Sequence, residues 1–139
     1  MTRNRESGFV ATELAFGVAV LVVPVALLLL TLPRWSERQV TARMIGREVA
    51  RRAARDGSCD QRGARALGAT MARNLGLSAN DLTVDLACAD GAGLPAGSDV
   101  EVRVTVSMPA VELPGLGAVG AWSWTARHRE PVDEYASAR

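Results

Sequence analysis

The chain has 139 residues, a mass of 14.7 kDa and a formal net charge of +1, and 48% of its residues are hydrophobic. This length allows one small domain and excludes a large two-domain enzyme or a doubly wound nucleotide-binding sheet. All 16 basic residues are arginines, which excludes lysine-dependent covalent catalysis, and the near-neutral charge gives no whole-chain signature of nucleic-acid binding.

The hydrophobic residues are concentrated in residues 9–33, where 19 of 25 positions are apolar and Glu13 is the only charge. Residues 14–32 carry no charge, and as a helix they would extend about 28 Å, close to the roughly 30 Å hydrocarbon core of a bilayer. The segment is also longer than the ~7–15 apolar residues of a cleavable secretory signal. The sequence therefore predicts one transmembrane helix over residues 9–33.

The helical pattern continues over residues 34–56, which carry seven arginines against three acids, a net charge of +4. One predicted face is apolar, and includes Trp35, Ala42, Ile45, Val49 and Ala53. Another is a row of arginines at four-residue spacing: Arg43, Arg47, Arg51 and Arg55. We expect an Arg-rich helical stem whose basic face is solvated, contacts anionic lipid, or contacts the acidic domain of a neighbouring subunit. Nucleic-acid binding is disfavoured because supporting aromatic residues are few.

A second, shorter helix is expected between Cys59 and Gly76. Its predicted apolar side consists of Ala66, Leu67, Met71 and Leu75.

Alternating apolar and polar residues then predict strands over residues 82–88, 100–108 and about 119–129. Short connections favour an antiparallel sheet with one face on a helix. The expected fold class is α+β: a long transmembrane helix, its stem, and a small domain over residues 57–131 with one helix and about three strands. Residues 132–139 are expected to form a tail.

Cys59 and Cys88 are the only cysteines, and they lie far apart outside the apolar segment. This pattern suits one disulfide formed in an oxidising compartment. Such a bridge would close a loop of about 30 residues and contribute ~3–4 kcal/mol to stability.

Three further features are candidates for a cofactor-binding, metal-binding or partner-binding site. Gly115, Gly117 and Gly120 form a G-x-G-x-x-G pattern, but too few residues follow for a dinucleotide-binding unit. His128, the only histidine, lacks the spacing signatures of a metal site. Trp122 and Trp124 favour core packing over a binding patch. We therefore expect no enzyme activity, no catalytic or metal-binding residues and no cofactor.

The N-terminus has a short basic leader over residues 1–8 that ends in Gly8, followed by Phe9 and, five positions after the glycine, Glu13. This arrangement resembles the class III signal of type IV pilins. The resemblance implies that a prepilin peptidase cuts between Gly8 and Phe9 at the cytoplasmic face, and leaves methylation of Phe9 open. It also implies that Glu13 attracts the N-terminal amine of a neighbouring subunit during assembly. The alternative is that Glu13 sits at the membrane interface and reaches water.

Over most of its length the chain resembles the TadE-like minor pilins, or pseudopilins, of tight-adherence (Tad/Flp-type) pilus systems. The segments that carry the resemblance are GFVATELAFGVAVLVVP, REVARRAARDG, DVEVRVTVSMP and ELPGLGAVGAWSWTARHREPVDEYA. It implies a subunit that enters or primes a pilus used in adhesion or secretion. The implied partners are the membrane, a prepilin peptidase, other pilin subunits and the assembly platform, with no nucleic acid and no small-molecule substrate. The alternative is a membrane-anchored binding module that enters no filament.

The expected location is the cytoplasmic membrane, with the N-terminus in the cytoplasm and the C-terminal domain outside, or extracellular within a pilus. Two arginines precede the apolar segment and six follow within ~20 residues, so the positive-inside rule favours the opposite orientation. The leader and the two cysteines favour the orientation with the domain outside.

Overall fold

The computed structural model describes residues 6–88, 93–113, 117–120 and 122–132. The chain divides into two compact units, Met1–Arg34 and Trp35–Arg139. The first helix, α1 (Glu6–Asp56), belongs to both units, so residues 35–56 are part of the same unit as the sheet.

The first unit consists of the beginning of α1. All residues from 11 to 26 are exposed, and the largest exposed side chains include Leu14, Phe16 and Leu21, each with about 70% of its surface accessible. The helix continues through Pro24. An apolar helix without a core of its own matches the predicted membrane segment.

The second part of α1 contributes one wall of the core. Ala42, Ile45 and Val49 are buried, as the periodicity predicts, because the apolar positions at spacings of three and four face the sheet. The helix ends at Asp56, and Gly57 follows with a φ of +58°, a left-handed conformation that suits glycine at a helix terminus.

The second helix, α2 (Gln61–Asn74), begins at Asp60, whose side chain accepts a hydrogen bond from the backbone N–H of Arg62 at 3.0 Å. Its fully buried residues are small: Ala64, Gly68 and Ala72. The predicted apolar side is therefore partly wrong. Leu67 and Met71 are partly buried, whereas Ala66 and Leu75 are exposed.

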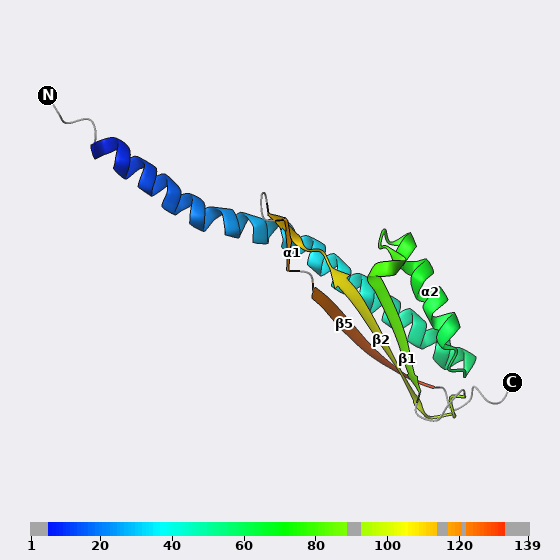
Figure 1. The fold of residues 1–139 in the computed structure, drawn as a ribbon. Helices are drawn as coiled ribbons and strands as arrows, with labels where there is room; N and C mark the ends of the chain where they lie inside the picture. The colour runs from blue at the N-terminus through cyan, green and yellow to red at the C-terminus, as the bar shows by residue number, and fades with distance from the viewer. Residues whose placement is uncertain (1–5, 89–92, 114–116, 121, 133–139) are drawn as a thin grey trace. The chain divides into compact units, whose positions relative to one another are not determined.

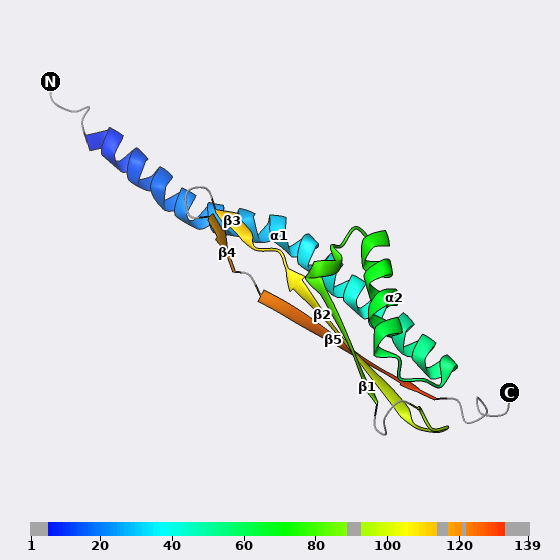
Figure 2. The ribbon, with the colours of Figure 1, turned by 45° about the vertical axis from the view of Figure 1, so that its right-hand side comes forward.

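Small residues are buried in α2 because its backbone lies close to the sheet. A Cβ added at Gly68 would lie 2.6 Å from Cγ2 of Val84 and 3.6 Å from Cγ2 of Ile45. Gly68 therefore sits where α2 meets both a strand and α1. Figures 1 and 2 show α2 and the second part of α1 along the same face of the sheet.

The main sheet has three antiparallel strands in the order β1-β2-β5. Strand β1 is Leu82–Cys88, preceded by a 3-10 turn at Ala79–Asp81; β2 is Asp99–Met108 and β5 is Trp122–Pro131. The buried side chains of β2 alternate along its whole length: Val100, Val102, Val104, Val106 and Met108. The predicted fold class, an α+β domain after one long apolar helix, is confirmed at this level.

A short hairpin separates β2 from β5, between residues 108 and about 119, where the sequence predicts no strand. It consists of β3 (Val111–Leu113) and β4 (Gly117–Val119), which pair antiparallel (Figure 2). Three-residue strands are too short for alternation to be recognised, which explains why they were missed.

A disulfide joins Cys59 and Cys88, with 6.4 Å between the Cα atoms. It connects the α1–α2 turn to the end of β1. Because the buried core consists largely of alanine and valine, a cross-link of this kind supplies a substantial share of the stability of the unit.

Candidate functional site

The apolar surface of α1 in the first unit is the most prominent surface feature of the molecule. Among the described residues, α1 is the one helix long and apolar enough to cross a membrane. Leu29 and Leu30 are 65% and 71% exposed, so this surface has no protein partner within its unit. Such a contiguous apolar surface indicates contact with lipid or with other helices.

Glu13 lies exposed on this helix, beside a shallow apolar hollow that is lined by Leu14, Gly17, Leu21 and their neighbours. No atom lies within 4 Å of a Cβ built at Gly17, so the helix backbone is accessible there. A small residue lets a second helix approach closely, and a carboxylate at membrane depth requires a partner. The assembly role of Glu13 stays a prediction.

Gly8 and Phe9 lie in the first turns of α1. Their assignment as a cleavage site stays a prediction.

The four arginines of the row are exposed in the second unit. Arg55 pairs with Glu48 at 3.7 Å, and the guanidinium of Arg43 lies 5.2 Å from the ring centroid of Trp124. Within the described part of the chain, Arg47 and Arg51 form no ion pair. Two positive charges on this helix are therefore available to an external anion.

The tryptophans combine core packing with some exposure. The rings of Trp35 and Trp122 meet edge to face at 5.7 Å, and Trp35 donates its indole N–H to the carbonyl of Pro109 at 3.2 Å. Trp35 and Trp124 are partly buried against the core, whereas Trp122 is 42% exposed. These contacts attach the start of the folded part of α1 to the sheet.

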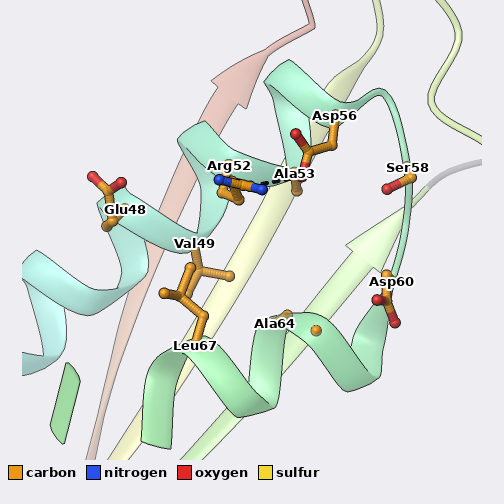
Figure 3. Close-up of a pocket in the computed structure, with 10 residues that line it drawn as sticks. Glu48, Val49, Arg52, Ala53, Asp56, Ser58, Asp60, Ala64 and Leu67 are labelled. Carbon is orange, nitrogen blue, oxygen red and sulfur yellow. Dashed lines mark hydrogen bonds and ion pairs between the residues drawn. The ribbon is translucent and has the colours of Figure 1, made fainter. Parts of the chain in front are cut away.

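A groove of about 460 Å³ lies between the last turns of α1 and the first turns of α2 (Figure 3). Its apolar wall consists of Val49, Ala53, Ala64 and Leu67, and Glu48, Arg52, Asp56, Ser58 and Asp60 provide polar groups. The groove exists because small residues of both helices face each other there. The sequence alone does not show that these residues meet.

The charged groups of the groove are already engaged. Arg52 pairs with Asp56 at 2.8 Å, Glu48 pairs with Arg55, and Asp60 caps α2. The groove can accept an apolar side chain, but its polar atoms form no arrangement of nucleophile, base and oxyanion donor.

The two remaining sequence features have structural roles in the described residues. Gly115 lies outside those residues, whereas Gly117 begins β4 and Gly120 precedes β5, so the G-x-G-x-x-G pattern opens no helix. His128 lies on β5, with Nε2 3.1 Å from Oε2 of Glu130. The described residues contain no group of three side chains suited to hold a metal ion.

Glu101 is the residue whose titration is clearly perturbed among the described ionisable groups. Hydrogen bonds from Arg103 at 2.8 Å and from Arg129 at 2.9 Å hold the pKa of this carboxyl below its usual value, because they stabilise the ionised form. This cluster lies on the sheet face opposite the helices.

No protein-family model, curated protein or solved structure matches this chain. The function is therefore inferred from its own residues and their geometry.

Proposed function

We propose that this protein is a membrane-anchored, pilin-like assembly subunit, a minor pilin or pseudopilin of the tight-adherence type. The observation that carries the proposal is α1 itself: one helix is exposed and apolar in its first part, and contributes to the core of a folded unit in its second. A membrane segment that continues without a break into a folded domain suits a subunit that is stored in a membrane and then packed through that helix.

The N-terminal pattern supports the assembly function. Gly8, Phe9 and Glu13 stand at the spacing of a prepilin peptidase site followed by the glutamate of a pilin helix. Cleavage after Gly8 would create an amine on Phe9. In a helix bundle of low dielectric constant, that amine and the carboxylate of a neighbouring Glu13 would attract each other strongly and fix the register of the subunits.

The disulfide supports an orientation in which the folded unit lies outside the cytoplasm. Cys59 and Cys88 are bridged, and structural disulfides persist in oxidising compartments. Under this proposal the leader faces the cytoplasmic peptidase and the arginines following the span are exceptions to the positive-inside bias.

The decisive experiment is N-terminal mass spectrometry of the native protein from cells that contain the peptidase. The expected mature chain begins at Phe9, eight residues shorter than the translated one. Gly8→Val should block this shortening, and Ser7→Ala, which leaves the glycine in place, should not. A full-length native chain, or an unchanged mature mass in the Gly8→Val variant, would refute processing at this site.

A second experiment separates a filament subunit from an anchored binding module, which the groove between α1 and α2 would suit. Single cysteines placed along residues 14–30 and oxidised in the membrane should give ladders of cross-linked subunits if α1 packs against other copies. Glu13→Gln should reduce those ladders, because it removes the charge that sets the register. Monomers at every position would favour the binding module.

A further inference from the structure

The two edges of the main sheet differ in how their backbone groups are satisfied. At the β1 edge, the side-chain amide of Gln61 donates to the carbonyl of Val84 and accepts from the N–H of Leu86, both at 2.7 Å. These are two of the bonds that a neighbouring strand would make. Gln61 therefore occupies the middle of the β1 edge, and Arg65 donates to the same Val84 carbonyl at 3.4 Å.

Among the described residues, no side chain pairs in this way with the β5 edge. In an antiparallel sheet, the backbone N–H and C=O groups of successive residues point to opposite sides of a strand. Val84 and Leu86 point away from β2, and the register then identifies every second residue of β5 as one whose backbone groups also point away from β2. These positions are Ser123, Thr125, Arg127 and Arg129. No described residue hydrogen-bonds to their backbone N–H or C=O groups. The strand is ten residues long, and its only proline is the last residue, Pro131. It thus presents a regular row of free donors and acceptors.

The charges beside this edge specify the kind of strand that fits it. Arg127 is directly opposite Arg103 in the sheet, and like charges in that arrangement repel. Arg103 and Arg129 both pair with Glu101, but within the described residues Arg127 has no acidic partner. A carboxylate on a strand added to the other side of β5 would compensate Arg127. The alternate residues of such a strand would lie beside Trp124 and Ala126, which favours apolar side chains there.

A second copy of this chain fits the edge poorly. The outward positions of β5 are Ser123, Thr125, Arg127 and Arg129, and none of them is acidic. A second β5 strand would therefore offer Arg127 no carboxylate and would add further arginines beside it. Pairing of β5 with β1 of another copy is opposed by Gln61.

We propose that the free edge of β5 binds an extended segment of another protein by strand addition, with acidic and apolar residues alternating along that segment. The backbone bonds supply the affinity, and Arg127 selects the acid. The proposal rests on residues of the folded unit alone, so its test is independent of the test of pilin processing.

The test measures amide hydrogen exchange in the full-length chain in detergent micelles. The probes are two capped decapeptides, one alternating valine and glutamate and the other alternating valine and lysine. With the glutamate peptide at ten times its dissociation constant, exchange at Ser123, Thr125, Arg127 and Arg129 should slow about tenfold. The amide of Leu86, already bonded to Gln61, should not change. The lysine peptide should give no protection.

Charge reversal tests the selection. Arg127→Glu should exchange the preferences, so that the lysine peptide protects and the glutamate peptide does not. Arg51→Glu, an exposed arginine without an ion pair on α1, is the matched control and should behave as wild type. Slow exchange at Trp124 and Ala126, whose amides face β2, verifies that each variant is folded.

Two results would overturn the proposal. If neither peptide slows exchange at the outward amides of β5, the edge does not bind an added strand. Protection that rises with protein concentration in the absence of peptide would show that a second copy occupies the edge instead.

Discussion

Two parts of one helix have opposite relations to their surroundings. In the part of α1 that lies in the first unit, Leu28 is 51% exposed and most residues around it are apolar. In the second, Ile45 is fully buried while its neighbours Met44 and Arg47 face outward. The backbone conformation is the same in both parts. What differs is the pattern of side chains, and that pattern decides whether lipid or protein covers the helix.

One continuous helix therefore belongs to two structural units. Residues 34–56 were expected to form a stem between a membrane segment and a domain, but residues 35–56 provide much of the core of the folded unit. The exposed arginines of this segment belong to the surface of that unit. Three experiments test the contrast between the two units, beginning with the largest expected effect, and a fourth tests a charge cluster on the sheet of the second unit.

The first experiment removes the apolar character of the first unit. Leu21→Arg combined with Val25→Arg should abolish stable membrane integration, because each arginine near the centre of a span costs roughly 2.5–3.5 kcal/mol. The fraction of chain that stays in the membrane pellet after alkaline carbonate extraction measures this. Met44→Arg with Leu75→Arg, at positions 51% and 47% exposed in the folded unit, should leave that fraction unchanged. If the first variant stays in the pellet, the span is misassigned.

The second experiment makes equivalent truncations in the two parts of α1. Ile45→Ala should lower the free energy of unfolding of the second unit by about 2–5 kcal/mol, because it opens a cavity among buried side chains. Leu28→Ala should change it by less than about 0.5 kcal/mol. Urea unfolding of the full-length chain in detergent, followed by tryptophan fluorescence, provides the measurement. Equal effects would contradict the division into two units.

The third experiment compares two helical glycines. Gly68→Ala should destabilise the second unit by about 1–3 kcal/mol, because the new methyl group would overlap Val84. Gly17→Ala has open space around it and should leave the same unfolding transition unchanged. The urea midpoints of the two variants give the answer, and a neutral Gly68→Ala would show that α2 can move away from β1 at little cost.

The fourth and smallest effect concerns pH. Arg103 and Arg129 lower the pKa of Glu101 in the folded chain. The ionised Glu101 carboxylate therefore contributes its full stabilisation at pH values above the pKa that this glutamate has in the unfolded chain. That contribution is lost as the pH falls through the lower folded-state pKa. Glu101→Gln should remove this part of the acid dependence, whereas Glu37→Gln, on an exposed position of α1, should not. If the free energy of unfolding depends on pH in the same way for wild type and Glu101→Gln, the ionised Glu101 is not stabilised by the two arginines.

Strong periodicity explains the elements that the sequence predicted well. The alternation from Val100 to Met108 and the three- and four-residue spacing around Ile45 reflect burial on one face, which is a local property of the chain. The buried face of α2 was predicted less well. Large apolar residues were expected inside, but close approach to β1 places Gly68 and Ala72 there and leaves Leu75 exposed.

The contacts between distant residues could not be predicted in this way. Nothing local to Gln61 indicates that its amide bonds to the backbone of β1, 23 residues away at Val84, or that Arg127 lies opposite Arg103. Both depend on the register of the strands, which is set by the packing of the whole sheet.

The sequence by itself determined the apolar segment, the leader pattern, the helical and strand periodicities and the presence of two cysteines. Each of these features depends on residue types and their spacing along the chain. The tertiary structure decided that part of α1 belongs to the core from residue 35 onward, that small residues line the α2 interface, and that Gln61 bonds to the edge of β1 while no described residue bonds to the outward groups of β5. These properties arise from side chains that meet only after the chain folds, since burial and register are set by elements far apart in the sequence.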